Sequence, residues 1–271
     1  SCTMCMRTIK LRRKEISGEG NIDFNLFKKV IDDGAKKGLC SIKLNYLGEP
    51  LVYKNIANLV AYAKKKGIID VMFNTNGVLL TCDLSKSLIR AGLDKIFISF
   101  DSPFKEKYEK IRAGANFEKV VENVRNLVRL RGELNKVNPI VGVNMTVMKE
   151  NKDEVLDFIK LWAPIVDLIG FGDYLNPQGL DNENRYAISL KKRENFVCPQ
   201  LYQRLFVHWD GRIGLCCVDY EAELDLCNAK DVLISEVWKG NQMNEIRTLH
   251  NSGKYEKIPL CNRCHHPCVP N

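Results

Sequence analysis

The sequence predicts an α/β fold built around a parallel sheet, followed by a small cysteine-rich unit. Between residues 25 and 171, alternating or apolar segments typical of strands take turns with segments of helical period. Strands that alternate with helices of this length indicate βαβ units, and right-handed crossovers join such units into one parallel sheet. This periodicity fails near residue 172, and seven of the eleven cysteines lie after residue 197. The alternation alone fits either a barrel or an open, doubly wound sheet.

Each element of the first part carries its own signal. In the first helix, over 25–38, Leu26, Phe27 and Ile31 recur near helical spacing, and Gly38 can end the helix. Gly67 can end the next helix in the same way. The expected strands are 41–47, 71–73, 95–100, 140–147 and 167–171, and the later helices are 54–66, 83–91, 117–131 and 152–162.

The second part begins after an irregular connector. The strand-like segment 204–209, the turn Asp210-Gly211 and the return segment 212–215 predict a β-hairpin. A single helix is expected near 234–251. The expected domains are therefore 1–172, the connector 173–197, and 198–271.

The composition excludes several classes of protein. A chain of 271 residues with 45% apolar content can bury a substantial core, and no run of about 18 apolar residues predicts a membrane span. The net charge of +8 (41 − 33) lies on Lys-rich helical faces without interleaved aromatic residues, so no nucleic-acid partner is expected. Attraction of an anionic substrate or a reductase partner stays open.

The eleven cysteines indicate a reducing compartment. No pattern of a basic region followed by an apolar one opens the chain. Without such a signal, the cysteines are expected to bind metal or to stay as free thiols, as cysteines do in the cytoplasm. The expected location is therefore cytoplasmic.

Polar motifs follow four of the five predicted strands. The carboxyl ends of parallel strands meet at one edge of a sheet, which is where ligands bind in such folds. Any one of these motifs also fits ordinary turn chemistry, but four in register predict a shared site. In strand order they are Gly48-Glu49, Thr75-Asn76-Gly77, Ser99 with Asp101, and Asn144.

Two cysteine patterns predict metal sites. Cys2 and Cys5 can converge from one loop, a spacing that fits a zinc knuckle, a redox pair or an iron–sulfur loop. Twelve residues separate Cys198 from Gly211 and four separate Gly211 from Cys216, so a hairpin with its tip at the glycine brings these cysteines together. Cys261 and Cys264, two residues apart, supply a second pair. Four thiolates suit either structural zinc or an iron–sulfur cluster.

In this order the motifs resemble the radical S-adenosylmethionine (SAM) superfamily, whose cluster loop reads C-x3-C-x2-C. Cys2 and Cys5 match the second and third cysteines of that loop. The first is expected just upstream of Ser1, and since no initiator Met is present, a missing N-terminal piece is expected. The resemblance implies a partial (β/α)6 TIM-like barrel with one more strand before Cys2. It also implies a 4Fe-4S cluster with one open iron that chelates SAM.

The resemblance implies roles for the strand-end residues. Glu49 and the backbone of Gly48 should contact the SAM amine, although Leu47-Gly48-Glu49 stands where the family has Gly-Gly-Glu. Ser99, Asp101 and Asn144 should contact the ribose or the carboxylate of SAM, and Arg112 should contact its carboxylate. Thr75 and Asn76 are looser assignments to the same site.

The C-terminal part resembles the SPASM/Twitch region of radical SAM enzymes, with its C-x(9–15)-G-x4-C element. The tail is short, so the one-cluster Twitch form fits better, and the arrangement is similar to the 2-deoxy-scyllo-inosamine dehydrogenase type. This likeness implies an auxiliary 4Fe-4S cluster held by Cys198, Cys216, Cys261 and Cys264.

Several functions stay open at this point. The first is oxidation of a secondary alcohol or sugar-like molecule, with the auxiliary cluster as electron acceptor. The others are epimerisation with Cys217 as hydrogen donor, modification of a peptide, and a non-catalytic zinc-binding βα protein. The radical enzymes would take a small-molecule or peptide substrate and an electron-donor protein such as flavodoxin or ferredoxin.

The remaining candidates are weaker. Cys227 and Cys268 are expected to be idle thiols, although Cys268 is an alternative member of the auxiliary set. His265 and His266 are alternative metal ligands, and Cys40 and Cys82 are expected to be structural. The expected pocket residues are Tyr174, Asn176, Gln178 and Tyr202.

Overall fold

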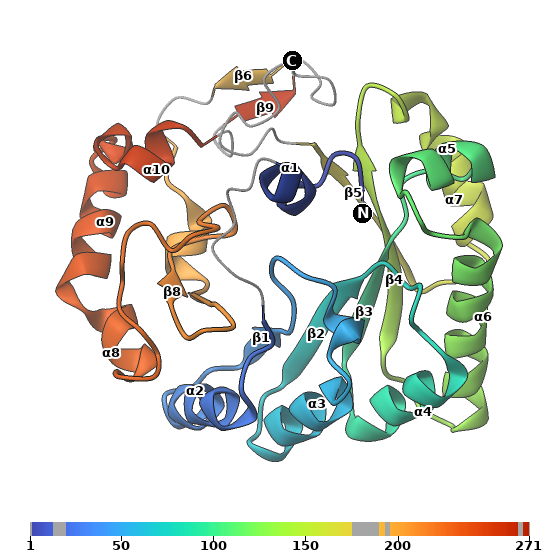
Figure 1. Cartoon of the computed structure of the whole chain (residues 1–271), viewed down its shortest axis with the longest axis horizontal. Helices are drawn as coiled ribbons and strands as arrows, with labels where there is room; N and C mark the ends of the chain where they lie inside the picture. The colour runs from blue at the N-terminus through green and yellow to red at the C-terminus, as the bar shows by residue number, and fades with distance from the viewer. Residues whose placement is uncertain (1, 13–19, 175–189, 193–195, 265–267, 271) are drawn as a thin grey trace. The chain divides into compact units, whose positions relative to one another are not determined.

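The structure, a computed structural model, describes residues 2–12, 20–174, 190–192, 196–264 and 268–270 of the chain (Figure 1). The chain divides into two compact units. The first comprises Ser1–Ile9 and Leu39–Tyr174, and the second comprises Lys10–Gly38 and Leu175–Asn271. Among the described helices, none has both the length and the apolar content to cross a membrane.

The first unit contains a five-stranded parallel sheet (Figure 1). Its strands are hydrogen-bonded in chain order, and each pairs in parallel with the next. They are β1 (Ser41–Lys43), β2 (Asp70–Thr75), β3 (Lys95–Ser99), β4 (Ile140–Val147) and β5 (Leu168–Asp173). This confirms the predicted α/β class and the presence of the five predicted strands, although the first, expected over 41–47, ends at Lys43. The parallel pairing places all their carboxyl ends at one edge.

The helices of the first unit follow the strands as predicted. Thr81 caps the N-terminus of α4 by accepting from the backbone N–H of Leu84 at 3.2 Å, and Gly92 ends that helix in the left-handed conformation. Three elements were not predicted: α1, η1 and α5, the last a short charged helix that buries Tyr108 and Ile111. The helical elements are α1 (Met6–Arg12), η1 (Pro50–Val52), α3 (Ile56–Lys65), α4 (Cys82–Ala91), α5 (Lys105–Ile111), α6 (Phe117–Glu133), η2 (Lys152–Glu154) and α7 (Val155–Trp162).

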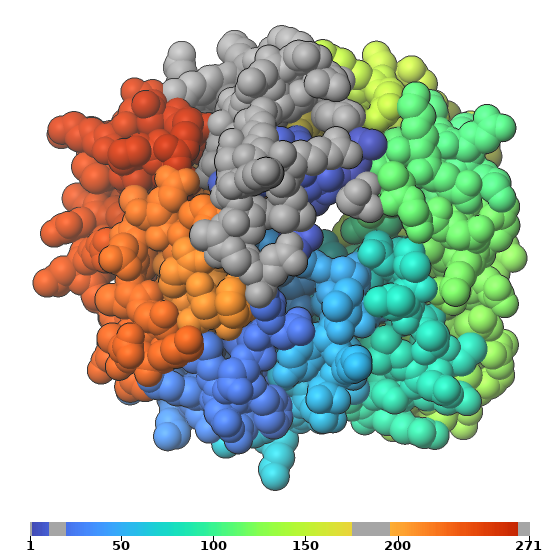
Figure 2. Space-filling model, viewed as in Figure 1, coloured from blue at the N-terminus to red at the C-terminus, as the bar shows by residue number. Residues whose placement is uncertain are grey.

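Packing against the sheet fixes where the strand ends lie. Strand β2 alternates between half-buried and buried side chains, as a strand beneath helices should. Phe100, directly after β3, stacks on Tyr108 of α5 at 4.1 Å and meets Trp162 of α7 edge-on at 4.9 Å. Burial of each such ring contributes about 1.5–3 kcal/mol, so α5 is held firmly beside the end of β3. The side chains of α5 and α6 form one continuous surface, green in Figure 2.

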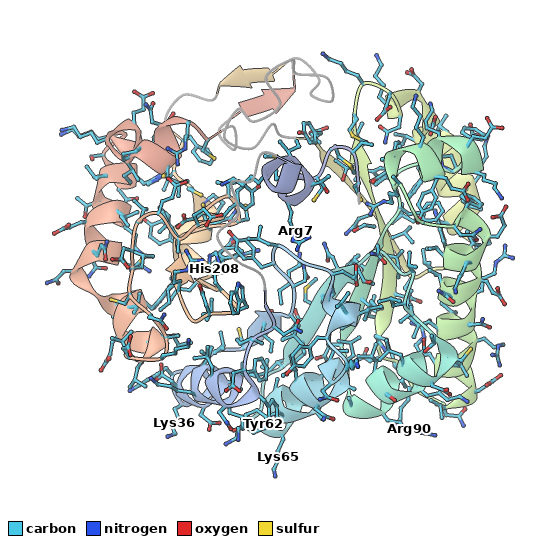
Figure 3. The ribbon with its side chains drawn as sticks, viewed as in Figure 1. Arg7, Lys36, Tyr62, Lys65, Arg90 and His208 are labelled. Atoms are coloured by element: carbon cyan, nitrogen blue, oxygen red, sulfur yellow. The ribbon has the colours of Figure 1, made fainter. Side chains whose placement is uncertain are left out.

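The basic residues of the helices behave as predicted for a solvated face. Lys65 of α3 and Arg90 of α4 are exposed and point away from the sheet (Figure 3). Lys36 of α2 (Phe24–Lys36), in the second unit, likewise points outward.

In this division helix α2 groups with the second unit, whereas it was expected from the sequence in a domain over 1–172. Leu26 of α2 packs in the apolar core of that unit beside Leu215 and Met243. The carboxylate of Asp33 accepts hydrogen bonds from the backbone N–H and the hydroxyl of Ser235 at 2.8 and 2.9 Å. Helical period locates such a helix in the sequence, but its packing partner lies some 200 residues away.

The second unit is built from short elements. The predicted hairpin is present, and Gly211 at its tip has a φ of +93°. The predicted helix over 234–251 is broken at Gly240, whose extended ψ of 162° separates two helices. A second strand pair, β6 with β9, includes part of the connector that was expected to be irregular. The elements are β6 (Leu190–Lys192), η4 (Pro199–Tyr202), β7 (Phe206–Val207), β8 (Ile213–Gly214), α8 (Ile234–Lys239), α9 (Asn241–Asn251), η5 (Tyr255–Lys257), α10 (Pro259–Asn262) and β9 (Cys268–Pro270).

Candidate functional site

Cys2 and Cys5 lie in one loop. We call these two cysteines, together with Asp101 and Arg112, the loop site. The backbone N–H of Cys5 donates to the carbonyl of Cys2 at 3.3 Å and closes the turn before α1. Cys2 also forms an isolated β-bridge with Arg112, beside a hydrogen bond from the N–H of Thr3 to the carbonyl of Ile111 at 3.0 Å. The loop is therefore fixed to the end of α5.

The guanidinium of Arg112 lies between a thiol and a carboxylate. Its Nη1 is 3.6 Å from Cys2 Sγ, and its Nη2 is 2.7 Å from Oδ2 of Asp101. Both side chains of this ion pair are buried. Burial raises the pKa of the Cys2 thiol, and the charge of Arg112 lowers it in part. For Arg112, burial disfavours the charge, but the facing Asp101 and Cys2 together raise the pKa of its guanidinium.

Asp101 is oriented by the loop after β4. Its Oδ1 accepts from the backbone N–H of Thr146 at 2.9 Å. The amide of Asn151 donates to the carbonyls of Asp101 and Thr146 at 2.8 and 2.9 Å. The sequence predicted Asp101 and Arg112 as separate ligand contacts, but the structure joins them in one buried pair. Asn151 was missed because an asparagine in a loop has no sequence signal beyond turn chemistry.

Three buried polar atoms at this pair lack a hydrogen-bond partner within the described residues. They are the hydroxyl of Tyr108, Nε of Arg112, and Oδ2 of Asp101, which has its ion pair with Arg112. Burial raises the pKa of Tyr108 well above its usual range, so its hydroxyl stays protonated. Buried polar atoms are normally hydrogen-bonded, so orphaned donors next to the two thiols fit a site completed by a bound polar group.

Glu49 forms a second group with the predicted residues of the next strand end. Its Oε1 accepts from the hydroxyl of Thr75 at 2.6 Å and from the N–H of Leu51 at 3.0 Å, and its Oε2 accepts from the N–H of Asn76 at 2.8 Å. Gly48 is exposed, with nothing within 4 Å of the position that a Cβ would occupy. Thr75 and Asn76 thus hold the carboxylate, and the Gly48 backbone is open to a ligand.

Ser99 and Asn144 are direct partners on β3 and β4. Each is the residue predicted at its strand end, and each is half-buried. The side-chain Oδ1 of Asn144 lies so close to Gly170 on β5 that a Cβ at that position would overlap it. The glycine therefore leaves room for the Asn144 amide.

The second unit contains a pocket walled by cysteines, which we call the cysteine cavity. It spans about 440 Å³ of space, part of which is open to solvent, and its other walls include Leu215, Tyr255 and Leu260. The predicted ligands all line it, together with Cys217. The five cysteines are Cys198, Cys216, Cys217, Cys261 and Cys264.

Local hydrogen bonds position these cysteines. Buried Asp219 accepts from the N–H of Leu215 at 2.9 Å, and its own N–H donates to the carbonyl of Cys216 at 3.1 Å. The N–H of Cys264 donates to the carbonyl of Cys261 at 3.2 Å, which closes the second pair. A turn at Asp219 therefore holds Cys216, and a turn of its own holds the pair Cys261–Cys264.

The apolar walls disfavour free thiolates in the cysteine cavity. Burial raises the pKa values of Cys198 and Cys216, and it raises that of Cys261 to about 12. A bound metal reverses this, because a coordinating thiol is deprotonated outright. Within the described residues, no three His, Cys, Asp or Glu side chains converge on the position of one metal ion. Five thiols around one pocket fit the donor set of an iron–sulfur cluster.

Among the other predicted candidates in the described residues, Cys217 lines the cavity. Cys217 is exposed at its side chain, and the amide of Gln200 donates to its sulfur at 3.1 Å. Cys40, Cys82 and Cys227 are exposed and do not line the cavity. Tyr174 is buried and Tyr202 is exposed. His265, His266, Asn176, Gln178 and the side chain of Cys268 lie outside the described residues.

Sequence reasoning missed His250. This histidine is buried in the last turn of α9 and lines the cysteine cavity, and burial lowers the pKa of its imidazole. A lone histidine at helical spacing carries no sequence signal that separates it from an ordinary core residue.

The comparisons with known proteins agree with this geometry. Residues 1–161 match the family model described as the Radical SAM superfamily, and residues 198–265 match that of SPASM, an iron–sulfur cluster-binding domain. The tungsten-containing aldehyde ferredoxin oxidoreductase cofactor-modifying protein of Pyrococcus furiosus is 35% identical over 138 residues, 49% of this chain and 37% of that protein. GTP 3′,8-cyclase of Lactiplantibacillus plantarum is 33% identical over 132 residues, 48% of this chain and 38% of that protein. The chain thus matches well under half the length of either relative.

A solved structure shares the fold. The structure of BtrN in complex with AdoMet, which is SAM, and 2-DOIA has a TM-score of 0.62 and 18% identity, and it covers 98% of this chain and 89% of that one. SAM and a 4Fe-4S cluster are therefore the cofactors of the first unit, and an auxiliary iron–sulfur cluster is that of the second. The chain belongs to the radical SAM superfamily and carries a C-terminal SPASM domain.

Proposed function

We propose that this chain is a radical SAM oxidoreductase that oxidises a secondary alcohol or sugar-like substrate to a ketone. The observation that carries the proposal is the cysteine cavity. Four thiolates from Cys198, Cys216, Cys261 and Cys264 would leave a 4Fe-4S cluster without an open iron. Such a cluster is suited to accept an electron rather than to bind the substrate.

The electrons in this alcohol oxidation balance with two cofactors, SAM with its cluster and the auxiliary cluster. When bound, SAM and the first cluster supply a 5′-deoxyadenosyl radical that takes a hydrogen atom, and the auxiliary cluster supplies a one-electron acceptor. The substrate loses that hydrogen atom from its carbinol carbon, then one electron to the auxiliary cluster and one proton to water. The reducing electron for SAM comes from a donor protein, and flavodoxin or ferredoxin stay the predicted donors.

Residues of the first unit orient the SAM and its cluster in this proposal. Cys2 and Cys5 supply thiolates to the iron, and Arg112 remains the candidate partner of the SAM carboxylate. Three hydrogen bonds to Glu49 occupy three of about four lone-pair positions, which leaves acceptor capacity for the SAM amine. Both oxygens of Asp101 are engaged, so we assign it to the orientation of Arg112 in place of a ribose contact.

Two strand-end residues keep their predicted ligand role. Ser99 and Asn144 are neighbours in register and half-buried, so their polar groups remain candidates for the ribose or the carboxylate of SAM. The relatives include a cyclase and a cofactor-modifying protein, so we do not assign a relative's substrate to this chain.

A second candidate function is epimerisation. The observation in its favour is the exposed thiol of Cys217, which accepts from Gln200 beside the cysteine cavity. In this reaction the thiol would give its hydrogen atom to the substrate radical. The sulfur radical would return to a thiol by taking one proton from water and one electron, which the donor protein would supply through the auxiliary cluster. Deuterium from solvent would then enter the product, and Cys217→Ala would abolish this.

Anaerobic incubation with SAM and a reductant tests the proposal. We expect one SAM consumed per ketone formed, with 5′-deoxyadenosine as a product. Cys261→Ala should still form 5′-deoxyadenosine but lose the ketone, whereas Cys227→Ala, an exposed cysteine outside the cavity, should behave as wild type. Normal ketone formation by Cys261→Ala with its first cluster intact would rule out the electron-acceptor role.

A further inference from the structure

His250 connects the two halves of the cysteine cavity. Its Nδ1 lies 3.4 Å from the backbone nitrogen of Cys198, and its Nε2 lies 3.4 Å from the sulfur of Cys261. The ring is 2% exposed and stacks on Tyr255 with ring centroids 5.5 Å apart. Buried on one face and bonded at both nitrogens, the imidazole has a fixed orientation.

The contact with Cys198 determines which nitrogen carries the proton. A backbone N–H can only donate, so Nδ1 must present its lone pair. In a neutral imidazole the single N–H is then at Nε2, which faces the sulfur of Cys261. A protonated ring would place a second N–H against the N–H of Cys198. The geometry therefore makes the imidazole a donor to the sulfur.

We propose that His250 is a positioning residue that raises the reduction potential of the auxiliary cluster through a hydrogen bond from Nε2–H to the sulfur of Cys261. A donor to a ligand sulfur stabilises the reduced cluster, which carries the additional negative charge, more than the oxidised one. The same ring holds the Cys198 backbone, so one side chain fixes both cysteine pairs.

This role concerns the cluster that the proposed function uses, but it does not depend on the reaction. A potential is measured without a substrate, whereas the acceptor role is tested by ketone formation. The hydrogen bond can therefore be present in an enzyme that does not dehydrogenate, and it can be absent in one that does.

Two substitutions separate the two contacts of the ring. In His250→Asn the side-chain oxygen can still accept from the N–H of Cys198, but the side chain is too short to reach Cys261. In His250→Gln the amide nitrogen can take the place of Nε2 and donate to the sulfur. Both are compared in the full chain carrying Cys2→Ala and Cys5→Ala, so that only the auxiliary cluster is titrated.

The readout is the midpoint potential of the reconstituted cluster, followed by electron paramagnetic resonance. With His250→Asn we expect the reduced-to-oxidised ratio at a fixed solution potential to fall about tenfold, which is about 59 mV for one electron. With His250→Gln we expect most of this loss to be recovered. An unchanged potential in the Asn variant, or equal losses in both variants, would overturn the proposal.

A measurement on the unsubstituted protein covers the case in which neither variant holds a cluster. With ¹⁵N-labelled histidine, the hydrogen bond predicts a nitrogen hyperfine coupling to the reduced auxiliary cluster. Absence of any histidine nitrogen coupling would contradict the contact directly.

Discussion

The two cysteine sites differ in what surrounds their sulfur atoms. At Cys2, burial raises the pKa of the thiol, but the guanidinium of Arg112 lies 3.6 Å from the sulfur and lowers it. At Cys261, burial and then the neighbouring thiols raise the pKa to about 12. None of the described residues that line the cysteine cavity is a lysine or an arginine.

This difference indicates how each site favours its thiolates. The loop site has a positive charge of its own, held in place by a buried ion pair with Asp101. In the cysteine cavity, the side chains of Gln200 and His250 lie within hydrogen-bond distance of cysteine sulfurs. In the cavity the metal itself must supply the positive charge, so thiol ionisation and cluster binding are coupled there.

The largest expected effect separates the two sites by chemistry. Cys5→Ala should lower 5′-deoxyadenosine formation to background, because the loop site loses a thiolate to its cluster. The auxiliary cluster should remain, since all of its candidate ligands lie in the other unit. Product analysis and electron paramagnetic resonance of the reduced protein measure both. Cys82→Ala, at an exposed cysteine, is the control, and loss of both clusters in Cys5→Ala would contradict independent sites.

The next effect tests the ion pair that only the loop site has. Asp101→Asn should lower the free energy of unfolding of the metal-free chain by about 3–5 kcal/mol, because Arg112 is left buried without its counter-charge. Urea denaturation measures this. Glu133→Gln removes the partner of Arg129 in a pair whose side chains are 53% and 52% exposed, and it should change stability by less than about 1 kcal/mol. Equal effects of the two variants would show that burial of the Asp101–Arg112 pair does not matter.

The elements that could be predicted from sequence are those with a local signal. Strand β4 has the bounds expected from its pattern, 140–147. Asn144, predicted at the end of this strand, lies opposite the last residue of β3, with three more residues of β4 after it. The pairs Cys198–Cys216 and Cys261–Cys264 were found because a glycine-tipped hairpin and a two-residue spacing are properties of the sequence itself.

The rest depends on contacts between distant segments. Helix α2 groups with the second unit because Leu26 packs in the core of that unit and Asp33 bonds to Ser235. Helical periodicity does not predict such long-range contacts. The pairing of Asp101 with Arg112 was missed because each residue matched a separate ligand role in the family resemblance. His250 contacts residues 52 and 11 positions away, so its function follows only from the folded chain.

The pH dependence of the free energy of unfolding tests the raised thiol pKa in the cysteine cavity. The pKa of Cys261 is raised from 9.0 to about 12 in the folded state, so the thiol keeps its proton in the folded chain while the unfolded chain loses it. The resulting stability is fully present below about pH 9 and is lost as the pH rises toward 12. The slope should be at most about 1.4 kcal/mol per pH unit for this thiol. Denaturation of the metal-free chain between pH 8.5 and about 10 measures it, and a slope that Cys261→Ala leaves unchanged would contradict the assignment.

The smallest expected effect tests ligand contact in the first unit alone. A methyl group at Gly170 would overlap Oδ1 of Asn144 and displace its amide, whereas a Cβ at Gly172, two residues along the same strand, would meet nothing within 4 Å. If Asn144 contacts SAM, Gly170→Ala should raise the SAM concentration for half-maximal 5′-deoxyadenosine formation about tenfold, or about 1.4 kcal/mol, and Gly172→Ala should not. Neither variant touches the cysteine cavity, so the auxiliary cluster should be unchanged in both. Equal SAM requirements for the two alanine variants would remove Asn144 from the SAM site and leave Gly48, Glu49, Ser99 and Arg112 as its candidates.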